Sequence, residues 1–140
     1  MKLAIVAAAA ALAAAAAPAG AYTGAFPVSA VYMRTGPDTA YPPVIVVPAG
    51  APVTVLGCLG GWHWCDVTYG PYRGWVAGAY LRATWQQRPM PFYYAAPRYN
   101  VPIVTFQFGP YWDAHYRARP WYYHRDRWSR WDYHHRRWHR

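Results

Sequence analysis

Short apolar runs separated by turn residues dominate the chain between residues 27 and 83. Five such runs occur, each followed by glycine or proline: 29–34, 44–47, 53–56, 62–68 and 73–77. No helical period runs through them. Short strands at regular spacing, closed by turn residues, are typical of all-β barrels and sandwiches. The sequence therefore predicts a small all-β barrel of about five short strands over residues 27–83.

The two cysteines of the chain, Cys58 and Cys65, lie on either side of Gly60-Gly61. In a hairpin that turns at these glycines, the two cysteines are cross-strand partners at a separation that suits a disulfide. Such a bond would stabilise a domain too small to depend on its hydrophobic core alone. We therefore expect a disulfide; two free buried thiols, or redox or metal chemistry, are the alternatives.

The N-terminal residues 1–21 have the layout of a secretory signal peptide. Lys2 precedes an apolar run over residues 3–17, which Pro18 ends. This run is shorter than the roughly 20 residues that span a bilayer. We expect cleavage after Ala21, or alternatively after Ala19; a retained anchor or an ordinary helix is the other interpretation. Export to the periplasm, the cell envelope or the medium would permit disulfides.

The charge after residue 21 is carried by Arg and Asp, because no Lys or Glu follows Lys2. Without Lys2 the formal net charge of +9 falls to +8. The chain also contains nine Trp and fourteen Tyr. A basic, aromatic-rich exported protein is expected to meet anionic partners such as lipid headgroups, cell-wall polymers or extracellular nucleic acid. Export argues against genomic nucleic acid.

The stretch from Tyr32 to Leu81 resembles the bacterial SH3-like domain, SH3b. The residues that carry the resemblance match the family pattern in order: Arg34, Gly36, Pro37, Tyr41, Gly50, Val53, Val55, Gly74, Trp75, Val76, Tyr80 and Leu81. The chain departs from the pattern at Tyr32, where the family usually has Asn, and at Pro43, which should lie at a strand start or sheet edge. The resemblance implies a non-catalytic module that holds peptidoglycan or peptide ligands.

Aromatic residues of this barrel are candidates for a ligand groove. Along residues 62–68, strand alternation places Trp62, Trp64 and Asp66 on one face, and Cys65 and Val67 on the other. We expect Cys65 and Val67 to point inward, so that Trp62 and Trp64 point outward. The candidate ligand-binding residues are Tyr32, Tyr41, Trp62, Trp64, Tyr69 and Tyr72. Core packing is the alternative for all of them, and we expect it for Trp75 and Leu81.

Catalytic patterns are weak in this chain. Its five carboxylates are all Asp, and no Ser or Cys has an evident base. It has no phosphate-binding loop and no H-E-x-x-H motif. We therefore expect a protein that is not an enzyme and has no cofactor or metal. The histidines near the C-terminus, His134, His135 and His139, are a weak metal-binding signal.

Residues 84–110 hold five prolines and are expected to form a linker. Within it, residues 103–108 alternate, with Ile103, Thr105 and Gln107 on one face of a possible strand. This strand would pair with an edge of the barrel or with a partner chain, because a lone strand is unstable. An extended linker is the alternative.

Residues 111–140 consist almost entirely of Trp, Tyr, His, Arg and Asp. The lack of aliphatic residues favours disorder. A helix after Pro120, induced by a surface, would place Trp121, Trp128, Trp131 and Trp138 on one face. Its arginines would point elsewhere: Arg125, Arg127, Arg130, Arg136, Arg137 and Arg140. Such a helix suits an anionic membrane surface; a folded appendage to the barrel is the third alternative.

Together these patterns predict an exported, non-enzymatic protein of the cell envelope. The SH3-like barrel would contact peptidoglycan or a peptide ligand, and the basic aromatic tail would add contact with an anionic surface. The alternatives are a periplasmic scaffold for protein interactions without a wall ligand, and a His-rich metal-handling protein.

Overall fold

The computed structural model describes residues 20–135. Residues 1–19 lie outside this range, and with them most of the predicted signal peptide. Residues 136–140 also lie outside it, and they include four of the predicted surface-binding residues: Arg136, Arg137, Trp138 and Arg140. No helix between residues 20 and 135 is long and apolar enough to cross a membrane.

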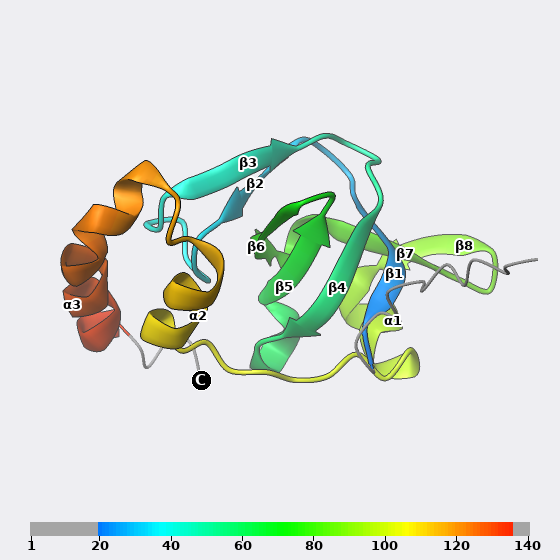
Figure 1. The fold of residues 1–140 in the computed structure, drawn as a ribbon. Helices are drawn as coiled ribbons and strands as arrows, with labels where there is room; N and C mark the ends of the chain where they lie inside the picture. The colour runs from blue at the N-terminus through cyan, green and yellow to red at the C-terminus, as the bar shows by residue number, and fades with distance from the viewer. Residues whose placement is uncertain (1–19, 136–140) are drawn as a thin grey trace, which may run out of the picture.

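Eight antiparallel strands form one curled sheet (Figure 1). Its order is β3-β2-β6-β5-β4-β1-β7-β8. The strands are β1 (Tyr22–Pro27), β2 (Val31–Arg34), β3 (Pro43–Val47), β4 (Val53–Cys58), β5 (Trp64–Tyr69), β6 (Tyr72–Ala77), β7 (Leu81–Trp85) and β8 (Arg88–Pro91).

The five predicted runs correspond to β2 to β6, so the prediction of a small all-β barrel of about five strands is confirmed in part: the fold is mostly β, but it has eight strands and C-terminal helices. The sequence patterns did not predict β1, β7 or β8. β1 lies between β4 and β7 and joins the two halves of the sheet. As predicted, Pro43 opens a strand, and that strand lies at an edge of the sheet, where a missing N–H costs no ladder hydrogen bond.

The predicted disulfide is confirmed. Cys58 and Cys65 pair across β4 and β5, with their Cα atoms 4.0 Å apart. A 3₁₀ turn (η1, Gly60–Trp62) joins the two strands, and Gly61 takes a φ of 79° that glycine adopts without strain. Both cysteines are fully buried. The bond therefore lies in the core that fills the concave side of the sheet.

This inner core is built from small and branched apolar side chains. Its fully buried members include Met33, Val47, Val55, Val67 and Ala83. The helix α1 (Phe92–Arg98) closes it by packing Phe92, Ala95 and Ala96 against β7. The predicted linker therefore folds, because β8 pairs with β7 and α1 buries one apolar face.

The C-terminal segment is also folded, which corrects the expectation of a disordered or surface-induced tail. It contains α2 (Phe108–His115), the 3₁₀ turn η3 (Pro120–His124) and α3 (Arg125–His135). In Figure 1, α2 and α3 lie at the end of the sheet that carries β2 and β3, and α1 lies at the other end. Burial of aromatic rings replaces the missing aliphatic side chains.

An extended segment over residues 101–107 connects α1 with α2. Ile103 forms a parallel bridge with Cys58, and the Val104 N–H donates to the Cys58 carbonyl at 2.8 Å. Gly57 permits this approach, since a Cβ there would lie 2.5 Å from Val104 Cγ1. The predicted alternation holds: Ile103, Thr105 and Gln107 are exposed, whereas the residues between them pack inward.

Candidate functional site

A second core lies on the outer, convex side of the sheet. Its buried members are Tyr41, Leu59, Trp75, Phe106, Phe108, Trp112 and Tyr116. Three of these come from the barrel, Phe106 comes from the extended segment, and the other three come from the C-terminal segment. This outer core is the reason why α2 and α3 lie against the barrel instead of in solvent, since aromatic side chains bury large apolar areas.

Tyr41 lies at the centre of the outer core and is fully buried. Its ring contacts those of Phe106 and Trp131, with centroids 5.7 and 5.1 Å away. Its hydroxyl donates to Asp132 Oδ1 of α3 at 3.0 Å. Burial and the Asp132 carboxylate raise the pKa of Tyr41. Tyr41 was predicted to line a ligand groove; in the structure it instead holds the last helix.

Asp66 and Arg73 form an ion pair on the adjacent strands β5 and β6, next to the outer core. Arg73 Nη2 and Nε lie 2.8 and 3.2 Å from the two carboxylate oxygens of Asp66. Although burial opposes the charge of Arg73, its hydrogen bond with Asp66 raises its pKa. The pair joins two neighbouring strands. Each carboxylate oxygen of Asp66 can still accept a further hydrogen bond.

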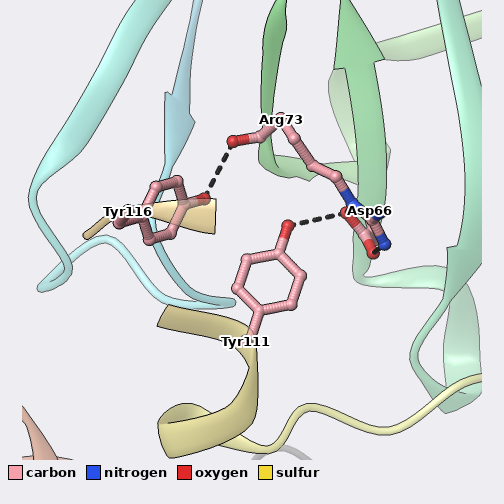
Figure 2. Close-up of polar contacts among 4 residues, drawn as sticks. All are labelled: Asp66, Arg73, Tyr111 and Tyr116. Atoms are coloured by element: carbon pink, nitrogen blue, oxygen red, sulfur yellow. Dashed lines mark hydrogen bonds and ion pairs between the residues drawn. The ribbon is translucent and has the colours of Figure 1, made fainter. Parts of the chain in front are cut away.

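Two tyrosines of the C-terminal segment form hydrogen bonds with the residues of this ion pair (Figure 2). The Tyr111 hydroxyl donates to Asp66 Oδ1 at 2.7 Å, and the Tyr116 hydroxyl donates to the Arg73 carbonyl at 2.8 Å. Burial is the main cause that raises the pKa of both hydroxyls. Both phenols are therefore neutral donors at physiological pH.

A hollow of about 260 Å³ opens beside this network, between the extended segment and α2. Its lining residues are Thr105, Gln107, Pro110, Tyr111, Ala114 and His115. The rings of Tyr111 and His115, one helical turn apart, meet edge to face with centroids 4.7 Å apart. Partial burial and the charge of Arg73 lower the pKa of His115, so its imidazole is neutral at physiological pH.

The predicted groove residues do not gather at one site. Tyr32 is exposed, paired with Val46 across the edge hairpin and lying under the guanidinium of Arg34. Trp64 packs against the outer core, whereas three others pack against the inner core: Trp62, Tyr69 and Tyr72. The predicted outward face of β5 is therefore correct for Trp64, but the C-terminal segment of the same chain covers it.

The described tryptophans of the predicted surface-binding face are turned toward the barrel. Trp121, Trp128 and Trp131 pack against the outer core. Among the described arginines of α3, Arg125 pairs with Asp113 at 2.9 Å, whereas Arg127 and Arg130 are exposed. The predicted separation of Trp and Arg faces is present for these residues, with the Trp face turned inward.

The sequence patterns did not predict the Asp66–Arg73 ion pair, the two tyrosines that bind it or the hollow. The only available signal was the alternation that placed Thr105 and Gln107 on one face. Nothing in the pattern placed that face beside Tyr111 and His115. Within residues 20–135, no group of three or more His, Cys, Asp or Glu side chains is arranged to hold a metal ion.

Comparison with known proteins agrees with this barrel. No curated protein matches the chain. Residues 29–82, however, match the family model described as the bacterial SH3 domain, and they contain β2 to β6 and the start of β7. Domains of this family are generally non-catalytic binding modules. Residues 29–82 of this chain therefore match the bacterial SH3 domain, and further strands and helices extend this region, with α2 and α3 packed on its outer side and α1 against the inner core.

Proposed function

We propose that this chain is an exported, non-catalytic binding protein of the bacterial cell envelope, whose SH3 domain contacts peptidoglycan or a peptide ligand. The observation that carries the proposal is the match of residues 29–82 to a family of cell-wall binding modules. The Cys58–Cys65 disulfide supports export, because such bonds persist in oxidising compartments. The signal-peptide pattern of residues 1–21 supports it as well.

The surface available to a ligand is smaller than the sequence suggested. The C-terminal segment covers Tyr41, Trp64 and Trp75. A ligand therefore has access to Tyr32 on the edge hairpin and to the hollow beside α2, both of which are open to solvent.

Contact with an anionic surface is the second part of the proposed function. Because Trp128 and Trp131 are turned toward the barrel, α3 would meet such a surface through charge and not by insertion. Arg127 and Arg130 are exposed one turn apart, and they follow the exposed Tyr123. Arg guanidinium groups bind phosphate and carboxylate oxygens in a bidentate manner. Such contacts weaken with salt.

One observation favours the alternative of a protein-interaction scaffold. β3 is an edge strand of five residues without a charge, PVIVV. Uncharged edge strands pair readily with another chain. A scaffold would bind a protein partner along β3 and would not bind purified peptidoglycan.

Co-sedimentation of residues 22–140 with purified peptidoglycan, and separately with anionic vesicles, tests the proposal across a salt series. We expect peptidoglycan binding that persists at high salt and vesicle binding that salt removes. The double variant Arg127→Gln/Arg130→Gln should weaken vesicle binding, whereas Arg82→Gln/Arg88→Gln is the matched control on another part of the surface. A folded chain that sediments with neither would contradict the proposed function.

A further inference from the structure

The hollow beside α2 is formed within residues 105–115, where the extended segment meets α2. Thr105 and Gln107 project from the extended segment, and Tyr111, Ala114 and His115 come from α2. The hydrogen bond between Tyr111 and Asp66 fixes α2 relative to the strands. Tyr111 is therefore held in place, and the hollow beside it is a shallow depression that is open to solvent.

Polar groups at this hollow are not used by the fold. Gln107 is the N-cap residue of α2, but its side chain makes no capping hydrogen bond. Neither Gln107 nor Thr105 uses its side chain in a hydrogen bond within residues 20–135. An amide has two donors and an acceptor, and a hydroxyl adds one donor and an acceptor. These groups are therefore available to a ligand.

The lining carries no charge. It consists of a hydroxyl, an amide, a neutral imidazole, a phenol, a proline ring and a methyl group. The ion pair of Asp66 with Arg73 lies next to Tyr111, and its two charges are paired with each other. A charged group in the hollow would find no opposite charge among the lining residues. The chemistry therefore selects an uncharged ligand with several hydroxyl or amide groups.

The size of the hollow selects one unit of a polymer. Its volume of about 260 Å³ lies slightly below the roughly 300–1,000 Å³ of pockets that enclose a whole small molecule. A pyranose ring has hydroxyl groups around its edge and an apolar C–H face. It can hydrogen-bond with Thr105 and Gln107 while its apolar face lies against the rings of Tyr111 and His115.

We propose that the hollow lined by Thr105, Gln107, Tyr111 and His115 binds an uncharged sugar unit of a glycan strand. This inference rests on the proposed function, because it names the part of a cell-wall polymer that this protein contacts. A peptide ligand is the competing class. Its charged termini and side chains find no opposite charge among the lining residues.

The test is titration of residues 22–140 with a β-1,4-linked N-acetylglucosamine tetramer. The buffer contains about 0.5 M NaCl, which screens surface charge. Isothermal titration gives the affinity, and NMR follows the Gln107 side-chain amide. Thr105→Val and Gln107→Ala should each weaken binding about five- to tenfold, as expected for the loss of a hydrogen bond. Thr84→Val removes an exposed hydroxyl elsewhere and should bind as the parent does.

Several outcomes would overturn the inference. One is a folded parent chain that does not bind the tetramer. Another is a tetramer that binds both variants as tightly as it binds the parent. Binding of a charged wall peptide, with shifts at Gln107, would assign the hollow to the competing class. If the parent sediments with peptidoglycan but fails to bind the tetramer, the proposed function stands without this site. If it binds the tetramer but not the wall, the site stands and the proposed function is wrong.

Discussion

The Tyr111 hydroxyl donates a hydrogen bond to Asp66 Oδ1 at 2.7 Å, which joins α2 to β5 across 45 residues of sequence. Tyr111→Phe removes this donor and keeps the ring in the outer core. Because a hydrogen bond to a charged group contributes about 1.5–3 kcal/mol, we expect the free energy of unfolding to fall by about 2 kcal/mol. Urea denaturation measures the change.

The control for this prediction is Tyr123→Phe, because Tyr123 is 88% exposed. That variant should unfold as the parent does. Equal stability of Tyr111→Phe and the parent would mean that the hydrogen bond to Asp66 does not hold α2 in solution.

A substitution of Trp112 would test whether the C-terminal segment is folded. Its side chain is fully buried, and its Nε1 donates to the Thr35 carbonyl at 3.0 Å. Trp112→Ala should lower the free energy of unfolding by about 3–5 kcal/mol, since it leaves a large cavity in the outer core. Limited proteolysis of this variant should cleave within residues 105–135. A variant as stable and as resistant as the parent would support the disordered tail that the composition favoured.

Removal of the disulfide by Cys58→Ala/Cys65→Ala should destabilise the barrel. The two residues are 7 apart in sequence, so the closed loop is short and the expected loss is about 2–3 kcal/mol in the chain-entropy model. Thermal unfolding by circular dichroism measures the change. A variant with the melting temperature of the oxidised parent would show that the hairpin register, and not the covalent bond, determines stability.

His115 makes stability depend on pH in the acidic range. Although His115 is exposed at the surface, partial desolvation and the charge of Arg73 lower its pKa below the ordinary value of 6.5, so the folded state binds the proton slightly less readily than the unfolded state and the effect on stability is small. This contribution is fully present above pH 6.5 and is lost as the pH falls through 6.5 toward the lowered pKa. His115→Gln should flatten this part of the stability profile. Denaturant titrations across the range test it, and His124→Gln, on the exposed surface, is the control.

Several predictions that depended on neighbours in sequence were correct, but strand alternation was wrong for Trp62, which lies in the turn η1 and packs against the inner core. The turn residues around β2 to β6 placed the barrel strands, and Gly60-Gly61 placed Cys58 opposite Cys65. The alternation of Ile103, Thr105 and Gln107 was correct for the same reason, because strand geometry is local. The prediction of a disordered tail was wrong. It rested on the lack of aliphatic residues, whereas the Trp and Tyr rings of the tail bury apolar area in their place.

The sequence by itself determined the strands β2 to β6, the disulfide and the separation of Trp from Arg on the last helix. Only the tertiary structure decided which way that helix faces, because its Trp face packs against Tyr41 in a loop about 90 residues earlier. It also decided where the hollow lies, since Tyr111 reaches Asp66 only after β5 and α2 have docked. Local patterns fix which side chains share a face, but the partner of each face is fixed by contacts between segments far apart in the chain.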